Sequence, residues 1–300
     1  MIDCQPSLFS WGNTSIAWIA ENVRIAWLTP IMFFFTELGH VGAILFTTAL
    51  SYWLWNKRYA RALLYGLFAN IFLNLLVKNS VRECRPPHQY WLENVSDSYS
   101  FPSGHAQIGV YLWFGFAFYC KEKWQSVICV LIGLLIALSR PYLGVHYPQD
   151  ITAGAILGLI VLAFTLFCEK KNIVFLASCP KLVRGIILIL IMGILQFIIS
   201  DPRNAEVSVI GSTLGFWLGC QLEYRTLDFK PARSLGLFIM QFIIGAAGIL
   251  FFWKGGDWLR HLLNESTALY VKYLQYFLLG LWIGYGAPAL VLKQRTTQPD

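Results

Sequence analysis

Long apolar segments recur along the whole chain of 300 residues and alternate with short polar stretches. Apolar runs of this kind predict helices that cross a lipid bilayer. They lie at residues 40–55, 59–77, 103–120, 124–138, 148–168, 183–199, 205–222, 234–253 and 268–291. Residues 6–35 are apolar and aromatic but are broken by glycine, asparagine and proline, so we expect interfacial or re-entrant helices there.

The composition supports the same fold class. Hydrophobic residues make up 57% of the chain and charged residues 13%, and the mean hydropathy is +0.56. Because these values lie far from those of an ordinary soluble domain, we predict an all-α, polytopic helical membrane protein. Three parts are expected: an interfacial or re-entrant segment at 1–38, a helix-bundle core of about five spans at 39–170, and a C-terminal membrane extension of about four spans at 171–300.

The net charge of +7 is unevenly distributed. Fourteen of the 23 lysines and arginines fall at segment ends that share one side of the predicted topology, namely residues 56–61, 120–124, 169–184, 223–233 and 293–300. Because basic loops mark the cytoplasmic side, the opposite side is expected to face the periplasm, the cell exterior or a lumen. No basic patch with interleaved aromatic residues predicts nucleic-acid binding, and we expect no cleavable signal peptide.

Cysteine and glycine spacing adds two predictions. The seven cysteines form no CxxC pair and no zinc-type pattern, and most lie in or beside apolar segments. We expect them to be packing residues, neither disulfide-bonded nor metal-bound. The small-residue ridges Gly154-x3-Gly158 and Gly211-x3-Gly215-x3-Gly219 favour close helix packing within the chain, with dimerisation as the alternative. The oligomeric state stays open.

Three polar clusters interrupt the apolar pattern, all on the predicted outer side. In the first, Lys78 and Arg85 are seven residues apart, so they would share a helix face until Pro86 and Pro87 end the helix. A planar guanidinium and a compact ammonium group together suit a phosphate. Taken alone, the pair is also typical of interfacial cations that extend toward lipid headgroups.

The second cluster, Pro102-Ser103-Gly104-His105, opens an apolar helix. Proline and serine are common at helix starts, so a simple cap is one interpretation. A helix N-terminus also presents free N–H groups to an anion, and Gly104 allows a ligand to approach the backbone closely. His105 would then lie one turn into the anion site, placed to give a proton to a leaving oxygen.

The third cluster contains Ser139, Arg140, His146 and Asp150. If a helix begins near Tyr147, His146 and Asp150 are neighbours on one face. Asp150 would accept from one imidazole nitrogen and leave the lone pair of the other aimed at phosphorus. Arg140 adds a phosphate clamp, and Ser139 either donates to a phosphoryl oxygen or caps the local backbone. An isolated His-x3-Asp is more often structural, so the three clusters together favour phosphate transfer.

In order and spacing, the clusters resemble the signature of the type-2 phosphatidic acid phosphatase superfamily, which includes membrane lipid phosphatases, glucose-6-phosphatase, bacterial class A acid phosphatases and vanadium haloperoxidases. The signature positions filled here are Lys78, Arg85, Pro86, Pro102, Ser103, Gly104, His105, Ser139, Arg140, His146 and Asp150. The resemblance spans residues 25–170. It implies a helical membrane phosphatase core, a phosphohistidine on His146, His105 as the acid, and no metal or cofactor. The residues it assigns to the phosphoryl oxygens are Lys78, Arg85, Ser103, Gly104 and Arg140.

The resulting expectation is a phosphatase acting on a lipid phosphate or diphosphate. Phosphatidate, phosphatidylglycerophosphate and a sphingoid phosphate are candidates, with a slight preference for a polyprenyl diphosphate. We expect a multi-pass protein of the bacterial inner membrane with its site on the periplasmic face. The alternatives are a sugar-phosphate phosphatase, a phosphotransferase, or a transporter that only binds phosphate. No second catalytic cluster is seen in residues 171–300, which are expected to form a scaffold or lipid-access wall, or else a substrate-selecting or partner-binding module.

Overall fold

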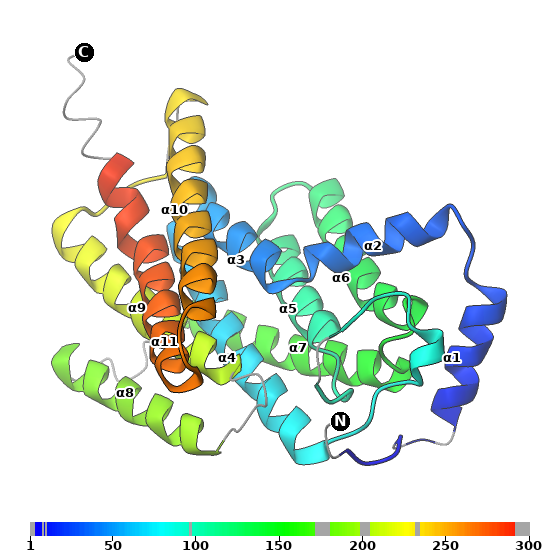
Figure 1. Cartoon of the computed structure of the whole chain (residues 1–300). Coiled ribbons are helices and arrows are strands. Elements are labelled where there is room, and N and C mark those ends of the chain that lie inside the picture. The colour runs from blue at the N-terminus through cyan, green and yellow to red at the C-terminus, as the bar shows by residue number, and fades with distance from the viewer. Residues whose placement is uncertain are drawn as a thin grey trace. The chain divides into compact units, whose positions relative to one another are not determined.

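The computed structural model describes residues 4–7, 9, 11–95, 98–171, 181–198, 205–231 and 235–291. Within these ranges the chain is helical, and extended pairing is confined to one isolated bridge between Gln5 and Glu83. Figure 1 shows the helices in chain order. The predicted all-α class is therefore confirmed.

Every predicted apolar segment forms a helix over nearly all of its described residues. The α-helices are α1 (Trp11–Asn22), α2 (Leu28–Leu38), α3 (Val41–Leu50), α4 (Lys57–Val81), α5 (Gly104–Tyr119), α6 (Lys123–Tyr142), α7 (Pro148–Lys170), α8 (Lys181–Ile198), α9 (Ala205–Thr226), α10 (Leu235–His261) and α11 (Glu265–Leu281). Short π-helices follow α3 at Ser51–Trp55 and α11 at Trp282–Gly286, and a 3-10 turn lies at His88–Tyr90.

Five of the described helices are long and apolar enough to cross a membrane: α4, α6, α7, α10, and α11 continued to Val291. The helices Leu28–Leu38 and Gly42–Trp55 follow one another with a bend of 62° between them. If this bent pair crosses the membrane as a single span, the number of spans is six. This number is smaller than the nine spans expected from the pattern. One reason is that α5 has only 16 residues, although it is apolar.

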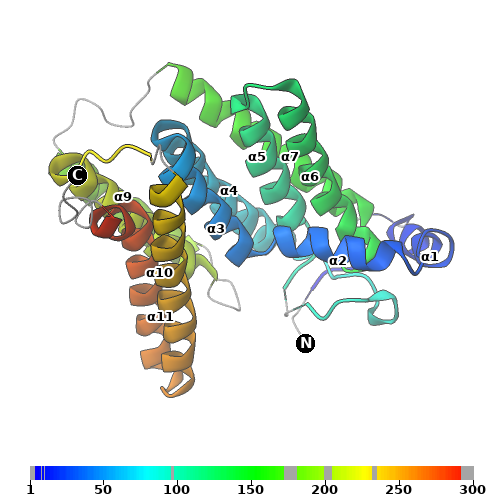
Figure 2. The same ribbon diagram turned by 90° about the horizontal axis from the view of Figure 1, so that it is seen from above.

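Contacts divide the chain into two compact units, and the first comprises residues 1–44, 65–173 and 201–203. In this unit α5 packs against both α6 and α7, and α2 packs against α6. Figure 2 shows α5, α6 and α7 side by side. A Cβ at Gly154 would lie 2.6 Å from the Ser103 carbonyl oxygen, and one at Gly158 would lie 2.4 Å from that of Gln107. The first glycine ridge therefore serves helix packing within the chain, as predicted.

Three buried amide side chains link α4 to α5. Asn74 Nδ2 donates to Gln107 Oε1 at 2.8 Å, and Gln107 Nε2 donates to Asn70 Oδ1 at 2.8 Å. Asn74 also donates to the Pro102 carbonyl oxygen, which lies directly before α5. Because unpaired polar groups are costly in apolar surroundings, these bonds favour a single register between α4 and the start of α5.

The second unit comprises residues 45–64, 174–200 and 204–300, and its closest helix pair is α9 with α11. A Cβ at Gly215 would lie 1.9 Å from the Phe277 carbonyl oxygen, so the two backbones touch at this position. The second glycine ridge thus also packs within the chain. The helix α10 runs past the predicted end at residue 253 to His261. Gln275 packs against Gly256 of this helix, and its Nε2 donates to the Trp253 carbonyl oxygen at 2.8 Å.

Replacing Gly215 with alanine is expected to lower the thermal stability of the second unit. The added methyl group must push α9 away from α11, which costs about 1–3 kcal/mol. Gly193→Ala in α8 is the matched control, because nothing lies within 4 Å of its Cβ position. Melting curves of the purified protein in detergent measure both effects, and equal melting temperatures for the two variants would contradict the backbone contact.

Five charged side chains of the second unit form ion pairs. Lys57 Nζ lies 2.9 Å from Glu223 Oε1 and 3.1 Å from Asp228 Oδ1, and Arg260 pairs with Asp257. Over the described ranges of the whole chain, no three or more His, Cys, Asp or Glu side chains are grouped to hold a metal ion.

Candidate active site

His146 lies in the loop before α7, and Asp150 lies in the first turn of that helix. His146 Nδ1 is 3.1 Å from Asp150 Oδ2, the contact that the four-residue spacing predicts. The same oxygen accepts from the Tyr147 backbone N–H at 2.9 Å and from the Ser100 hydroxyl. The carboxylate is thereby fixed and favours a proton on Nδ1, which leaves the lone pair of His146 on Nε2.

Gly144 makes the turn that leads from α6 to His146. Its φ of +78° lies in the left-handed region, and a Cβ there would lie 1.9 Å from the Tyr90 carbonyl oxygen. Only glycine meets both conditions. The Val145 N–H then donates to the Arg140 carbonyl oxygen at 3.2 Å, which closes the turn at the end of α6.

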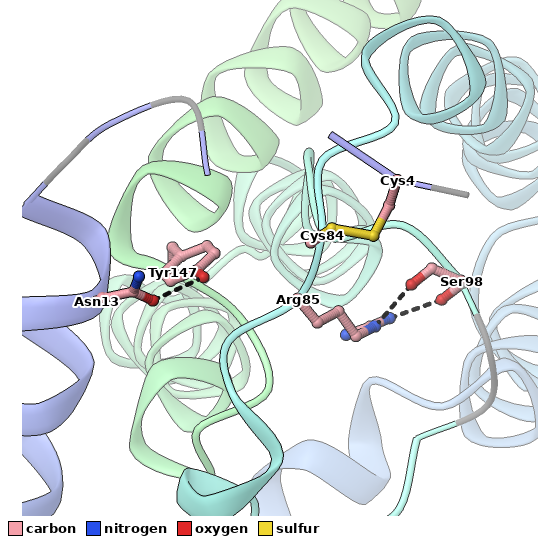
Figure 3. The surroundings of a disulfide bond; sticks show 6 residues. All are labelled: Cys4, Asn13, Cys84, Arg85, Ser98 and Tyr147. Atoms are coloured by element: carbon pink, nitrogen blue, oxygen red, sulfur yellow. Dashed lines mark hydrogen bonds between the residues drawn. A yellow bond between two sulfur atoms is a disulfide. The ribbon is translucent and has the colours of Figure 1, made fainter. Parts of the chain in front are cut away.

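Arg85 lies beside the free nitrogen of His146. Its Nη1 is 3.1 Å from His146 Nε2 and donates to the Val145 carbonyl oxygen at 2.8 Å. Two further bonds hold the guanidinium to Ser98, from Nε to the carbonyl oxygen at 2.9 Å and from Nη2 to the hydroxyl at 2.7 Å (Figure 3). A phosphoryl group approaching His146 Nε2 would therefore meet a guanidinium that is already oriented.

His146 is neutral in this environment. Burial, and then the nearby charges of Arg85 and Lys78, lower the pKa of His146 well below its ordinary value of 6.5. An imidazole with a lowered pKa keeps its lone pair at neutral and mildly acidic pH, as a nucleophile requires.

Lys78 and Arg85 do not share a helix face, so that prediction is wrong. The helix α4 ends at Val81, four residues early, because Arg82 has a positive φ of 54°. The chain beyond it is extended and pairs with Gln5. Lys78 Nζ instead donates to the carbonyl oxygens of Tyr99 and Ser100, at 2.7 and 3.2 Å. Both cations therefore converge on the segment 98–100, which sequence reasoning missed because nothing in its local pattern distinguishes it from the surrounding loop.

The second cluster forms the start of α5. Ser103 is the N-cap, its side chain accepts from the Ala106 N–H, and its own N–H donates to the Asp150 carbonyl oxygen at 3.0 Å. The helix N-terminus is thus attached to the first turn of α7. A Cβ at Gly104 would meet only Asn74, at an ordinary 3.4 Å, so packing among the described residues does not require glycine there. His105, the next residue, is partly buried, and its Nε2 is fully covered.

Arg140 is buried at the end of α6 and lies in a polar network. Its Nη1 donates to Glu93 Oε2 at 2.7 Å and to the Thr36 hydroxyl. Glu93 also faces His40, whose Nε2 is 3.6 Å from Oε1. Burial raises the pKa of Glu93, but the contact with His40 and the charge of Arg140 outweigh burial and lower it, so Glu93 is ionised. The Ser139 hydroxyl donates to the Ile136 carbonyl oxygen at 2.7 Å.

Thr36, His40 and Glu93 were not predicted from the sequence. They lie outside the three motifs and reach the site only through tertiary packing. The one local signal was the presence of a carboxylate and a histidine in or beside a strongly apolar region, which marks functional candidates in membrane proteins.

Cys4 and Cys84 form a disulfide bond, so the prediction of no disulfide is wrong for these two residues. The sequence separation of 80 residues hides the pairing from any local pattern. Figure 3 shows the disulfide bond at Cys84, the residue directly before Arg85. A second contact of the N-terminal segment is the hydrogen bond from Tyr147 OH to Asn13 Oδ1, at 2.9 Å. The N-terminal segment is thus attached to Cys84 and Tyr147, the neighbours in sequence of Arg85 and His146. Of the other cysteines, 120, 129, 168 and 220 form no disulfide bond, and Cys179 lies outside the described residues.

Cys4→Ser is expected to destabilise the protein by about 2–5 kcal/mol, because the unfolded chain loses a constraint that closes a long loop. Melting curves in detergent, with and without a reducing agent, measure the change. Cys168→Ser is the matched control, since that thiol is free. A melting temperature that is the same in wild type and Cys4→Ser under oxidising conditions would show that the bond contributes nothing to stability.

Comparisons with known proteins match both units. The PAP2 superfamily model matches residues 59–173, and a model described as PAP2 superfamily phosphatase, transmembrane extension, matches residues 207–299. The chain is 30% identical to undecaprenyl-diphosphatase of Sulfolobus acidocaldarius over 49% of its own length and 73% of that protein. It is 29% identical to phosphatidylglycerophosphatase B of Bacillus subtilis over 53% of its length and 84% of that protein. Sphingosine-1-phosphate phosphatase 1 of Mus musculus is 27% identical over 72% of this chain and 54% of the relative.

The helical membrane fold and these matches define a membrane phosphatase, an integral multi-pass protein that hydrolyses phosphoric esters. More particularly, the chain belongs to the PAP2 superfamily, the group that the three polar clusters predicted. Residues before 59 lie outside the matched models.

Proposed function

We propose that this chain removes a phosphate from a lipid phosphate or diphosphate through a phosphohistidine at His146. The observation that carries the proposal is the environment of that imidazole, with Asp150 at 3.1 Å from Nδ1 and Arg85 at 3.1 Å from Nε2. This arrangement supplies an oriented lone pair beside a group that can hold phosphoryl oxygens. A site that only binds phosphate does not need a buried, neutral nucleophile, so the arrangement argues against the transporter alternative.

The reaction proceeds in two in-line steps. In the first, His146 Nε2 bonds to phosphorus while the bond from phosphorus to the leaving oxygen breaks, and His105 gives that oxygen a proton. In the second, water attacks the phosphohistidine, its proton passes to His105, and the bond from nitrogen to phosphorus breaks. Asp150 holds Nδ1 throughout and stabilises the positive charge that develops on the ring.

Four groups would stabilise the phosphoryl oxygens: Lys78, Arg85, Arg140 and the first N–H groups of α5 at Gly104. Cations and helix N-termini both favour the charge that spreads over these oxygens in the transition state. Ser103 and Ser139 are the further phosphate-binding candidates. The Ser103 side-chain oxygen accepts from the Ala106 N–H, and the Ser139 hydroxyl donates to the Ile136 carbonyl oxygen. Arg140 must exchange part of its contact with Glu93 for the phosphate.

A lipid is the favoured substrate class. The relatives quoted above are named for a prenyl diphosphate, a phosphatidylglycerophosphate and a sphingoid phosphate, all of which join a phosphate to an apolar tail. Among these we favour a polyprenyl diphosphate. The outward faces of α6 and α7 expose large apolar side chains, including Leu138 and Ile160, that suit contact with lipid tails.

The site is proposed to lie on the outer face of a bacterial inner membrane. The distribution of lysine and arginine supports this side. The disulfide between Cys4 and Cys84 also supports it, because such bonds form in the periplasm and outside cells rather than in the cytosol. We keep the three parts at 1–38, 39–170 and 171–300, with the last as a membrane scaffold.

Phosphate release from a substrate panel tests the proposal. Purified protein would be given polyprenyl diphosphate, phosphatidate, phosphatidylglycerophosphate, sphingosine 1-phosphate and glucose 6-phosphate, each with and without EDTA. We expect release from at least one lipid, unchanged by the chelator. Release from glucose 6-phosphate alone would favour the sugar-phosphate alternative, and no release from any substrate would favour phosphate binding without catalysis.

A further inference from the structure

A third histidine lies against the proposed acid. His40 occupies the break between α2 and α3, outside the matched family models. Its ring centroid is 5.0 Å from that of His105, and the two rings meet edge to face at 88°. The neighbouring Gly39 approaches the same ring, since a Cβ there would lie 2.6 Å from His105 Cδ2. The break in the helix pair is thus what brings His40 to the acid.

The contact with Gly39 orients the His105 ring. Cδ2 is bonded to Nε2, so the ring edge that carries Nε2 faces the α2–α3 break. His105 Nε2 is buried and has no hydrogen-bond partner among the described residues. Nδ1 lies across the ring from Cδ2 and is the nitrogen left for the phosphate side.

A second proton is poorly tolerated on His105. Desolvation, and then the charges of Arg140, His40, Arg85 and Lys78, lower the pKa of this partly buried ring well below its ordinary value. A neutral His105 holds one N–H proton. After it gives this proton to a leaving oxygen, the ring needs another proton from a neighbouring group.

His40 is suited to supply that proton. Its side chain is 46% exposed, whereas Nε2 of the partly buried His105 is fully covered. Two carboxylates favour its charged form, Glu93 Oε1 at 3.6 Å and Glu37 Oε1 at 3.8 Å from Nε2, while Arg140 opposes it. Among these neighbours Glu93 does most to raise the pKa of His40.

We propose that His40 is a positioning residue that acts through His105 and resupplies its proton. In the first step the Nδ1–H bond of His105 breaks as the leaving oxygen gains that proton, and Nε2 gains a proton from the His40 imidazolium. In the second step water gives a proton to Nδ1, and the proton on Nε2 returns to His40. No net proton is gained or lost by the pair over a cycle. This inference rests on the proposed function, because it needs His105 to be the acid.

Leaving-group dependence tests the relay. p-Nitrophenolate leaves without a proton, whereas the alkoxide or phosphate of a lipid substrate leaves poorly without one. We expect His40→Gln to lower kcat for the best lipid of the panel by about 10–100-fold and to change kcat for p-nitrophenyl phosphate by less than about 3-fold. His88→Gln is the matched control, because His88 stacks on Trp91 outside the site. Equal losses on both substrates, or no loss on either, would overturn the relay.

The pH dependence of kcat is a second test, which needs neither a second substrate nor a substitution of His40 or His105. Glu37 is exposed, and its change to glutamine removes a charge that favours protonated His40. The basic limb of kcat for the lipid should therefore move to lower pH by about 0.2–0.5 units. An unmoved limb in Glu37→Gln, or a wild-type profile in His40→Gln, overturns the relay.

His105→Ala separates failure of the relay from failure of the proposed function. If His105→Ala loses activity on the lipid and retains it on p-nitrophenyl phosphate, while His40→Gln behaves as wild type, only the relay fails. If His105→Ala itself shows no dependence on the leaving group, the assignment of His105 as acid fails, and the relay fails with it.

Discussion

Replacing His146 with alanine is expected to reduce phosphate release by at least about 10⁴-fold, because the reaction loses the atom that bonds to phosphorus. The neighbouring Arg85 and Asp150 remain, so substrate binding should survive better than turnover. Stopped reactions with radiolabelled substrate measure this directly, since wild type should form an acid-labile phosphoprotein and the variant should form none.

His261→Ala is the control for this substitution, because His261 is an exposed residue at the end of α10. It should release phosphate at the wild-type rate. A His146→Ala protein that still turns over, or that still carries label, would falsify the phosphohistidine mechanism while leaving the phosphatase class intact.

Asp150→Asn is expected to cost about 10³–10⁴-fold in kcat, although the side chain keeps its size. Asp150 Oδ2 accepts from the Tyr147 N–H and the Ser100 hydroxyl as well as facing His146 Nδ1. An amide cannot keep all of these contacts and also stabilise a charged imidazole. If its NH₂ group faces Nδ1, His146 shifts its proton to Nε2 and loses the lone pair needed for attack.

Asp228→Asn is the matched control, since it makes the same chemical change at an exposed carboxylate paired with Lys57. Rates of phosphoprotein formation in single-turnover experiments separate the two variants. Wild-type rates in Asp150→Asn would mean that the carboxylate only caps α7.

Local parts of the site were predictable from the sequence. His146 and Asp150 meet because helical spacing brings residues four apart together at the start of α7. Ser103 caps α5 because serine before an apolar run is a common helix start. In both cases a few consecutive residues determine the contact, so no knowledge of the rest of the chain is needed.

Contacts across loops were not predictable in this way. The pattern placed Arg85 on α4, but the helix ends at Val81 and the extended chain beyond it pairs with the N-terminal segment. The pairing of Cys4 with Cys84 depends on the same arrangement. Whether a helix continues through one more turn depends on competing tertiary contacts, which outweigh local propensity.

The sequence by itself determined the helical membrane frame, the superfamily and the chemical identity of the three clusters, because apolar periodicity and short motifs are properties of neighbouring residues. Only the tertiary structure decided how the clusters meet. It attached Arg85 to Ser98, joined Arg140 to Glu93, and set His40 against His105. Each of these contacts joins residues from different segments, and their meeting depends on the packing of helices and the paths of loops, which no local pattern encodes.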